Sequence, residues 1–285
     1  MNFGVVVLNY MAHEATIACV DSFIRQSSYG HRVFIVIVDN ASPNESFEVL
    51  NSRYRSHPIV SVVQTKENLG FANGNNFGLC EIRKRFEPDY VIFSNDDIVL
   101  IEDGLYKWIL ECDEMYHFAV LGPRIYSTKG DYSQNPLPDY VTNIDQCRRE
   151  IRKYRVFLAK LCIKKALRMQ SNYPALARWE NNADQEPTDK MTLHGSFQVF
   201  SAGYFSAYTE AYDPRTFLYG EEYILRLRCN AKGLKMVYSP GYRVNHMQAV
   251  STEMMNKSSF GRAFFRTKHI IRFLKIYINI LENMR

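Results

Sequence analysis

The chain has 285 residues, of which 46% are hydrophobic and 23% are charged, and its formal net charge is +5. This length and composition fit a packed globule of one large domain, with or without an added lobe, and exclude a disordered chain. The positive charge belongs to two segments, because residues 145–170 hold nine Lys or Arg against two acids and residues 257–285 hold seven against one. The rest of the chain carries nineteen basic and twenty-seven acidic residues, a net charge of −8.

The cysteines and the apolar runs bear on the cellular compartment. Six cysteines lie far apart without a Cys-x-x-Cys or metal-type spacing, so they are interpreted as reduced thiols that fill the core. The first apolar run, Val5–Leu8, is too short for a secretory signal. No run approaches the ~20 apolar residues that cross a bilayer. We therefore expect a cytoplasmic protein, with peripheral association with the inner face of the cell membrane left open.

Residues 1–126 alternate between strand and helix patterns. Short apolar runs rich in β-branched residues predict buried strands over residues 3–8, 33–38, 60–64 and 90–94. Apolar residues at helical spacing predict helices over residues 12–26, 46–55 and 73–85. Continuous apolar strands separated by helices indicate an α/β fold with a mostly parallel sheet covered by helices, in which ligands bind at the carboxyl ends of the strands.

The pattern changes after this first part. Residues 127–190 are turn-rich and basic, and we predict a variable helical insertion there. The compact pattern returns in residues 191–251, the predicted catalytic and acceptor-binding part of the same domain, with a helix over 221–232. Residues 252–285 are predicted to contain a basic amphipathic C-terminal helix over 260–281.

Polar side chains follow several of the predicted strands. One strand ends in Asn95-Asp96-Asp97, where two adjacent carboxylates repel each other unless a cation lies between them. Such a site suits Mg²⁺ or Mn²⁺ that carries a phosphate-bearing substrate, whereas a solvated turn is the alternative for an isolated pair. Asp39 follows another strand, where it accepts hydrogen bonds from a nucleoside or caps the next turn.

Three further segments carry candidate residues. Residues 67–76 are rich in Gly and Asn before a helix, which favours either a phosphate-binding loop or a structural turn. Glu221 and Glu222 follow aromatic residues at a helix start, where a carboxylate with a raised pKa acts as a general base or simply complements the helix dipole. His246 is a structural histidine, or an additional metal ligand if the carboxylates bind a cation.

In this order the motifs resemble family 2 glycosyltransferases, the inverting enzymes of GT-A fold that use sugar nucleotides and include bacterial polysaccharide and lipopolysaccharide transferases. The resemblance covers roughly residues 1–126 and 193–251, from Val5–Tyr10 to the segment after His246. The residues that it implies bind the nucleotide-sugar are Asn9, Tyr10, Asp39, Asn68, Gly70, Asn75, Asp96 and Gly195.

The resemblance also implies the catalytic groups. Asp97 would be the principal ligand, and His246 an associated ligand, of Mn²⁺ or Mg²⁺ on the diphosphate, although Asn95 replaces the leading Asp of the usual motif. Glu222 matches the catalytic base, which is frequently Asp in the family, and Glu221 stays an alternative. The implied reaction transfers a sugar from a nucleotide-sugar donor to a hydroxyl of a glycan or lipid-linked acceptor. The alternatives are a nucleotidyltransferase that makes sugar nucleotides and a non-catalytic adaptor that binds sugar nucleotides or lipids.

The two basic segments suggest a further partner. Apolar residues gather on one face of residues 148–169 and of residues 260–281, with basic residues on or beside the other face. Such helices bind anionic membrane surfaces, or they pack their apolar face on the core, and the sequence supports both. No nucleic-acid motif accompanies the charge, so we expect no nucleic-acid partner. The oligomeric state is not predicted.

Overall fold

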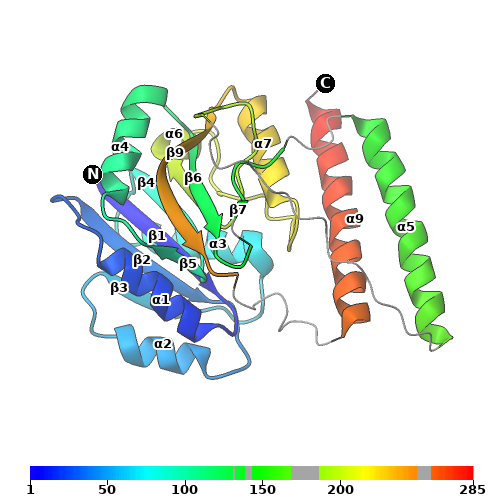
Figure 1. The fold of residues 1–285 in the computed structure, drawn as a ribbon, viewed down its shortest axis with the longest axis horizontal. Helices are drawn as coiled ribbons and strands as arrows, with labels where there is room; N and C mark the ends of the chain where they lie inside the picture. Colours follow the sequence, from blue (N-terminus) through cyan, green and yellow to red (C-terminus); the bar gives the residue numbers. More distant parts are fainter. Residues whose placement is uncertain (131, 139–142, 168–185, 249–257, 285) are drawn as a thin grey trace.

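The computed structural model describes residues 1–130, 132–138, 143–167, 186–248 and 258–284. Its described strands form one sheet in the order β3-β2-β1-β4-β8-β6-β9-β5, with β7 paired to β6 (Figure 1). The strands are β1 (Asn2–Asn9), β2 (Arg32–Asp39), β3 (Val60–Gln64), β4 (Tyr90–Asn95), β5 (Ile98–Leu100), β6 (Val120–Ser127), β7 (Tyr132–Ser133), β8 (Phe197–Ser201) and β9 (Met236–His246). The helices are α1 (His13–Ile24), α2 (Ser46–Tyr54), α3 (Gly70–Arg83), α4 (Leu105–Tyr116), α5 (Ile144–Ala166), α6 (Ala202–Phe205), α7 (Glu221–Ala231) and α9 (Ser259–Asn283).

The sheet has a parallel half and a mixed half. β1 pairs in parallel with β2 and β4, and β2 pairs in parallel with β3. β8 then runs antiparallel to both β4 and β6, while β6 and β9 are parallel. Among the described strands, β3, β2, β1, β4, β6 and β9 therefore share one direction. This confirms the predicted α/β fold, whereas the reversed β8 in its middle was not predicted.

Helices cover both faces of the sheet, as predicted. Successive side chains of a strand point to opposite faces, so Val5 and Val7 of β1 pack in the core shared with α1, α2 and α4. Val6 packs in the second core, which α3, α6 and α7 complete. The buried β-branched runs thus explain why the strands lie inside, and they fix the polar strand ends at one edge of the sheet.

Helices α5 and α9 form an antiparallel pair beside this domain (Figure 1). Arg148, near the start of α5, lies 3.2 Å from Glu282 at the end of α9, and Lys165 lies over the Phe260 ring at the opposite ends of both helices. Their buried apolar side chains form one cluster with Ile224 of α7. The predicted apolar faces of residues 148–169 and 260–281 are therefore packed inside the molecule, apart from Met169, which lies outside the described residues.

Two findings complete the comparison with the predicted elements. Of the helices that the structure describes, none combines the length and the apolar character that crossing a membrane requires.

Helix α3 begins at Gly70 and not at Asn73 as predicted. The reason is tertiary, because the Asn40 side chain at the end of β2 accepts a hydrogen bond from the Leu69 amide (2.9 Å) and thus holds the first turn.

Candidate active site

Asn9 and Asp39 meet at the carboxyl ends of β1 and β2. The strand register places them opposite each other, and Nδ2 of Asn9 donates to Oδ2 of Asp39 over 2.7 Å. Both side chains are buried. The other oxygen of Asp39 accepts hydrogen bonds from the Ser42 amide and from the Gln64 side chain. Asp39 thus caps the turn after β2, and the structure brings Asn9 and Asp39 together as the resemblance implied.

Asn40 organises the loop that follows β3. Its Nδ2 donates to Oδ1 of Asn68 (3.2 Å) and to the Gly70 carbonyl (3.1 Å). Oδ1 of Asn68 also accepts from the Gly70 amide. Asn68 therefore shapes the loop through its side chain. Asn40 was not predicted as a site residue, although its position directly after Asp39 at a strand end was the available signal.

Gly70 joins this loop to the segment before α7. Its φ is +76°, and a Cβ there would lie 2.2 Å from the Phe217 carbonyl oxygen. That oxygen accepts a hydrogen bond from the Phe71 amide (2.7 Å). Only glycine satisfies both the backbone conformation and the close approach. The predicted donor loop and the predicted base segment are thus in direct contact.

Asn75 lies deeper, on the buried face of α3. Its Nδ2 donates to the Phe71 carbonyl one turn earlier (3.0 Å). Its Oδ1 is buried and has no hydrogen-bond partner within the described part of the chain. The next residue, Asn76, bonds the backbone of Tyr212 through both ends of its amide.

Three of the six described non-glycine residues with a positive φ lie near the same edge of the sheet. Met11, Ala41 and Tyr219 have φ values of +62°, +56° and +73°, in the left-handed region that side chains other than Gly, Asn and Asp seldom adopt. Met11 follows Asn9 and Tyr10, Ala41 follows Asp39, and Tyr219 precedes α7. Such residues cluster at functional sites because the surrounding structure must hold them there.

Asp96 and Asp97 occupy the turn between β4 and β5, and both are 5% exposed. Oδ2 of Asp96 lies 3.5 Å from the Tyr10 amide, which links this turn to the end of β1. Oδ1 of Asp97 lies 3.1 Å from Nε2 of His246 at the end of β9. The pairing of β5 with β9 produces this contact, because it sets Ile98 opposite His246.

The Asp97–His246 pair has the properties of two ligands of a divalent cation. Nδ1 of His246 lies 2.6 Å from Oε1 of Gln134, which accepts a hydrogen bond from it, and Nε2 is the ring nitrogen that faces Asp97. Oδ1 of Asp97 is buried without a hydrogen-bond partner in the described residues. Adjacent ligands of an octahedral Mg²⁺ are about 3 Å apart, which fits the observed 3.1 Å.

A cation at this position would need further ligands. Among the described residues there is no group of three or more His, Cys, Asp or Glu side chains that could hold a metal. Mg²⁺ is commonly bound through one or two protein ligands together with substrate phosphates and water. The pair therefore fits a cation that arrives with a diphosphate. Gln134, which orients the histidine, was missed because its turn-rich segment shows no pattern.

His194 lies between the Asp97–His246 pair and the candidate base Glu222. Its ring is 6.0 Å from the His246 ring, and its Nδ1 lies 2.9 Å from Oγ of Ser196. Burial, and to a smaller extent the neighbouring His246, lower the pKa of His194 to about 3. His194 is therefore neutral at physiological pH, and it contacts His246 of β9 and precedes the Gly195 amide that contacts Glu222 of α7 without adding charge.

Glu222 approaches the residue next to His194. The Gly195 amide donates to Oε1 of Glu222 over 3.3 Å, and Glu222 remains partly exposed. Burial raises its pKa, which favours a group that accepts a proton near neutral pH. Glu221 is 5% exposed, and its Oε1 has no hydrogen-bond partner among the described residues. Burial and the Glu222 carboxylate raise the pKa of Glu221 to about 8.

The site residues predicted from the sequence thus lie along one edge of the sheet. A series of contacts runs from Asp39 through Asn9, and from Tyr10 through the Asp96-Asp97 turn, to His246 and on to Glu222. Asn68 and Gly70 border this edge through Asn40 and Phe217, and Asn75 is buried behind them. Of the segment matched after His246, residues 249–251 lie outside the described residues.

Comparisons with known proteins bear on the family and on the fold. A family model described as "Glycosyltransferase like family 2" matches residues 2–263. No curated protein matches the sequence significantly.

Among solved structures, S. aureus TarS aligns with 90% of this chain and 38% of its own, at 14% identity and a TM-score of 0.54. S. aureus TarS 1–349 in complex with UDP-GlcNAc aligns with 95% of this chain and 65% of its own (12% identity, TM-score 0.55). GalNAc-T7 with UDP, GalNAc and Mn²⁺ aligns with 94% of this chain and 47% of its own (13% identity, TM-score 0.59). These similarities confirm the GT-A fold, while the chain spans less than two thirds of the length of each of these proteins.

Proposed function

The chain belongs to glycosyltransferase like family 2, and we propose that it transfers a sugar, with inversion, from a nucleotide-sugar donor to a hydroxyl of a glycan or lipid-linked acceptor. The observation that carries this proposal is the convergence of the Asp97–His246 pair and Glu222 on the segment that begins at His194. One edge of the sheet thereby offers groups for the diphosphate and a base for the acceptor, within reach of one bound substrate pair.

The base assignment rests on exposure and on hydrogen bonding. Glu222 is partly exposed and is held by the Gly195 amide, so its carboxylate can face an acceptor hydroxyl. Glu221 is buried, and its Oε1 has no hydrogen-bond partner among the described residues. Burial raises the pKa of both carboxyls, so exposure and the Gly195 contact decide the assignment, and we give the role of base to Glu222.

The reaction follows as a single displacement. Glu222 accepts the proton of the acceptor hydroxyl while that oxygen forms a bond to the anomeric carbon of the sugar. The bond between this carbon and the diphosphate oxygen breaks on the opposite face, and the nucleoside diphosphate leaves with the electron pair. Inversion at the carbon is the consequence, and one base suffices. Mn²⁺ or Mg²⁺ held by Asp97 and His246 would stabilise the negative charge of the leaving diphosphate.

The remaining strand ends would hold the nucleotide. Asn9, Tyr10 and Asp39 lie at the carboxyl ends of β1 and β2, where the nucleoside would bind. The Gly70 loop would line the sugar and phosphates between them. Support for Mn²⁺ and a UDP-sugar comes from the similar fold of GalNAc-T7, which is described with UDP, GalNAc and Mn²⁺.

A screen of nucleotide sugars tests the proposal. We expect one or more of them to raise the melting temperature of the protein in the presence of Mn²⁺, and to be consumed when an acceptor is added. Glu222→Gln should keep the donor-dependent stabilisation while turnover falls by about 10²- to 10⁴-fold. Transfer by Glu222→Gln at the parent rate would contradict the base assignment. Donor binding without turnover in the parent protein would instead identify an adaptor.

A further inference from the structure

We propose that the outward face of α5 docks on an anionic phospholipid surface. This surface, called here the α5 outer face, consists of Arg152, Lys153, Val156, Lys160, Ile163 and Leu167. The proposal rests on the proposed function and extends it, because it names the surface on which the enzyme would encounter a lipid-linked acceptor. It concerns the side of α5 opposite to the apolar face that the sequence suggested for membranes, because that face is packed on α9.

Three apolar side chains lie in the middle of this face and are exposed to solvent. Val156 is 55% exposed, Ile163 is 58% exposed and Leu167 is 65% exposed. Their spacing of seven and then four residues places them on one stripe of the helix. The buried residues Ile151 and Leu161 lie on the other side. A helix packed on a soluble domain normally presents polar residues outward, so this outward apolar stripe is not explained by folding.

Cations flank the apolar stripe, and no acid neutralises them from within this stretch. Residues 151–167 contain six Lys or Arg and no Asp or Glu. Arg152, Lys153 and Lys160 are exposed, and of these three only Lys153 forms an ion pair within the described part of the chain, with Glu150 one turn earlier. Exposed apolar residues between Lys and Arg are typical of helices that lie in the interface of an anionic membrane.

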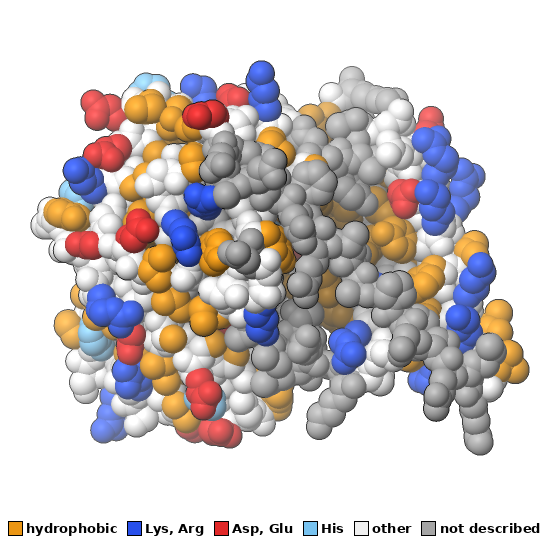
Figure 2. Space-filling view, viewed as in Figure 1, with side chains coloured by type: hydrophobic (Ala, Val, Ile, Leu, Met, Phe, Trp, Pro, Cys, Tyr) orange, Lys and Arg blue, Asp and Glu red, His pale blue; other side chains and the backbone are white. Residues whose placement is uncertain are grey.

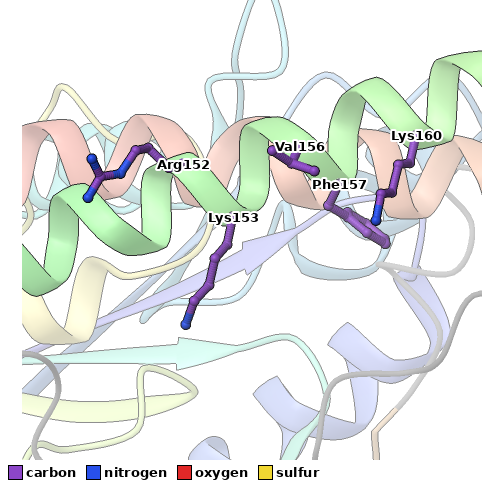
Figure 3. Close-up of a pocket in the computed structure, with 5 residues that line it drawn as sticks. All are labelled: Arg152, Lys153, Val156, Phe157 and Lys160. Atoms are coloured by element: carbon purple, nitrogen blue, oxygen red, sulfur yellow. The ribbon is translucent and has the colours of Figure 1, made fainter.

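Figures 2 and 3 show the same arrangement. In Figure 2, Lys and Arg side chains line the right edge of the molecule over α5, with hydrophobic side chains between them. Among the described residues, Arg152, Lys153, Val156, Phe157 and Lys160 line a hollow of about 400 Å³. Lys153, Phe157 and Lys160 extend from the same side of the helix (Figure 3). The charged ends of the Lys and Arg side chains would bind the phosphate of a phospholipid headgroup, and the apolar side chains between them would contact the first part of its acyl chains.

The position of α9 connects this surface to the candidate active site. A Cβ on Gly220 would lie 2.3 Å from the Phe273 ring of α9. Phe217 stacks on His269 at 5.0 Å between ring centroids. The segment that leads into Glu222 is therefore packed directly on α9, which in turn packs on α5. A membrane bound at α5 would hold the active site close to lipid-linked acceptors.

Vesicle sedimentation with the full chain tests the proposal. We expect binding to vesicles of phosphatidylcholine mixed with phosphatidylglycerol, weaker binding at high salt, and little binding to phosphatidylcholine alone. Each cation near an anionic surface contributes about fivefold in affinity, so Lys153→Gln with Lys160→Gln should weaken binding roughly 25-fold. Val156→Ser with Ile163→Ser should weaken it about tenfold, and this loss should persist at high salt.

The control removes the same charge elsewhere. Lys84 and Lys107 are 66% and 67% exposed, and Lys84 pairs with Glu81 as Lys153 pairs with Glu150. Lys84→Gln with Lys107→Gln should leave vesicle binding unchanged. The proposal would be overturned if the two double Lys→Gln variants lost vesicle binding equally. Binding that is independent of phosphatidylglycerol would also overturn it. So would a dimer in size-exclusion chromatography that Val156→Ser with Ile163→Ser dissociates, because the face would then bind a second copy. The donor-dependent stabilisation described above needs no vesicles, so it separates failure of this proposal from failure of the proposed function.

Discussion

The Gly195 amide donates a hydrogen bond to Oε1 of Glu222 over 3.3 Å, and the α-carbon of Gly195 faces the same carboxylate. A Cβ at position 195 would lie 2.8 Å from that oxygen. Because residue 195 has no side chain, the carboxylate of Glu222 can lie against its α-carbon, and the Gly195 amide orients this carboxylate. Two residues on different elements thus define the position of the proposed base.

Gly195→Ala tests this relationship. The added methyl group should displace the Glu222 carboxylate, and a misplacement of the base by about 1 Å lowers kcat by about 10²-fold. Donor-dependent thermal stabilisation should change little, since Asn9, Tyr10 and Asp39, the proposed nucleoside contacts, do not touch Gly195 in any hydrogen bond among the described residues. Gly203→Ala is the matched control, because a Cβ there would lie 3.4 Å from Oγ of Ser201 and is otherwise unobstructed. Equal kcat values for the two variants would argue against the positioning role of Gly195.

Glu221→Gln should change the pH dependence of stability more than the activity. The folded protein holds the Glu221 proton up to about pH 8, whereas the group in the unfolded chain has its ordinary pKa of 4.5. Between these values the unfolded state binds fewer protons, so the free energy of unfolding falls as the pH rises, by at most about 1.4 kcal/mol per unit. Gln resembles the protonated carboxyl and removes this slope.

Urea denaturation across the pH range measures this effect. Relative to Glu221→Gln, the parent protein should lose stability steadily from mildly acidic to mildly basic pH. Near neutral pH the variant should keep most of its transferase activity, in contrast to Glu222→Gln. Parallel pH profiles of stability for parent and variant would show that Glu221 is ionised in the folded state.

Gly70→Ala should destabilise the protein strongly. Its φ of +76° costs an alanine roughly 1 kcal/mol. The collision with the Phe217 carbonyl oxygen, 2.2 Å from the added Cβ, costs about 1–3 kcal/mol more. Gly30→Ala is the control, because Gly30 has a similar φ of +79° and nothing lies within 4 Å of its Cβ position. The difference between the urea midpoints of the two variants isolates the collision, and equal midpoints would refute the close approach.

Gln134→Leu should weaken metal binding without removing a ligand. Oε1 of Gln134 accepts from Nδ1 of His246, so its loss leaves the tautomer and the orientation of the ring unfixed. Such partners contribute about 10- to 100-fold to metal affinity. Titration of Mn²⁺ in the presence of UDP, followed by electron paramagnetic resonance, measures the loss. Gln134→Glu should restore much of the affinity because a carboxylate also accepts this proton, whereas an unaltered affinity in Gln134→Leu would exclude the orienting role.

Local sequence patterns were sufficient for β1 to β4 and for the described helices apart from α4 and α6, whereas β5 to β9 were not predicted. The predicted strand over residues 60–64 coincides with β3, and the helix predicted over 221–232 ends one residue later than α7. These elements depend on neighbouring residues, because apolar periodicity and β-branched runs act within one segment. The polar residues at the ends of β1, β2 and β4 could also be recognised from the sequence, because each follows an apolar run directly. Parallel pairing of these strands was enough to bring the polar ends to one edge of the sheet.

The sequence by itself determined the α/β alternation, the residues at the strand ends and the family to which the motifs point. Only the tertiary structure decided which distant groups meet. Gln134 reaches His246 across 112 residues, and nothing in either segment indicates the contact. The same holds for the burial that distinguishes Glu221 from Glu222 and for the packing of α9 against α5. Such contacts depend on how whole elements pack together, and a pattern confined to one segment carries no information about its neighbours in space.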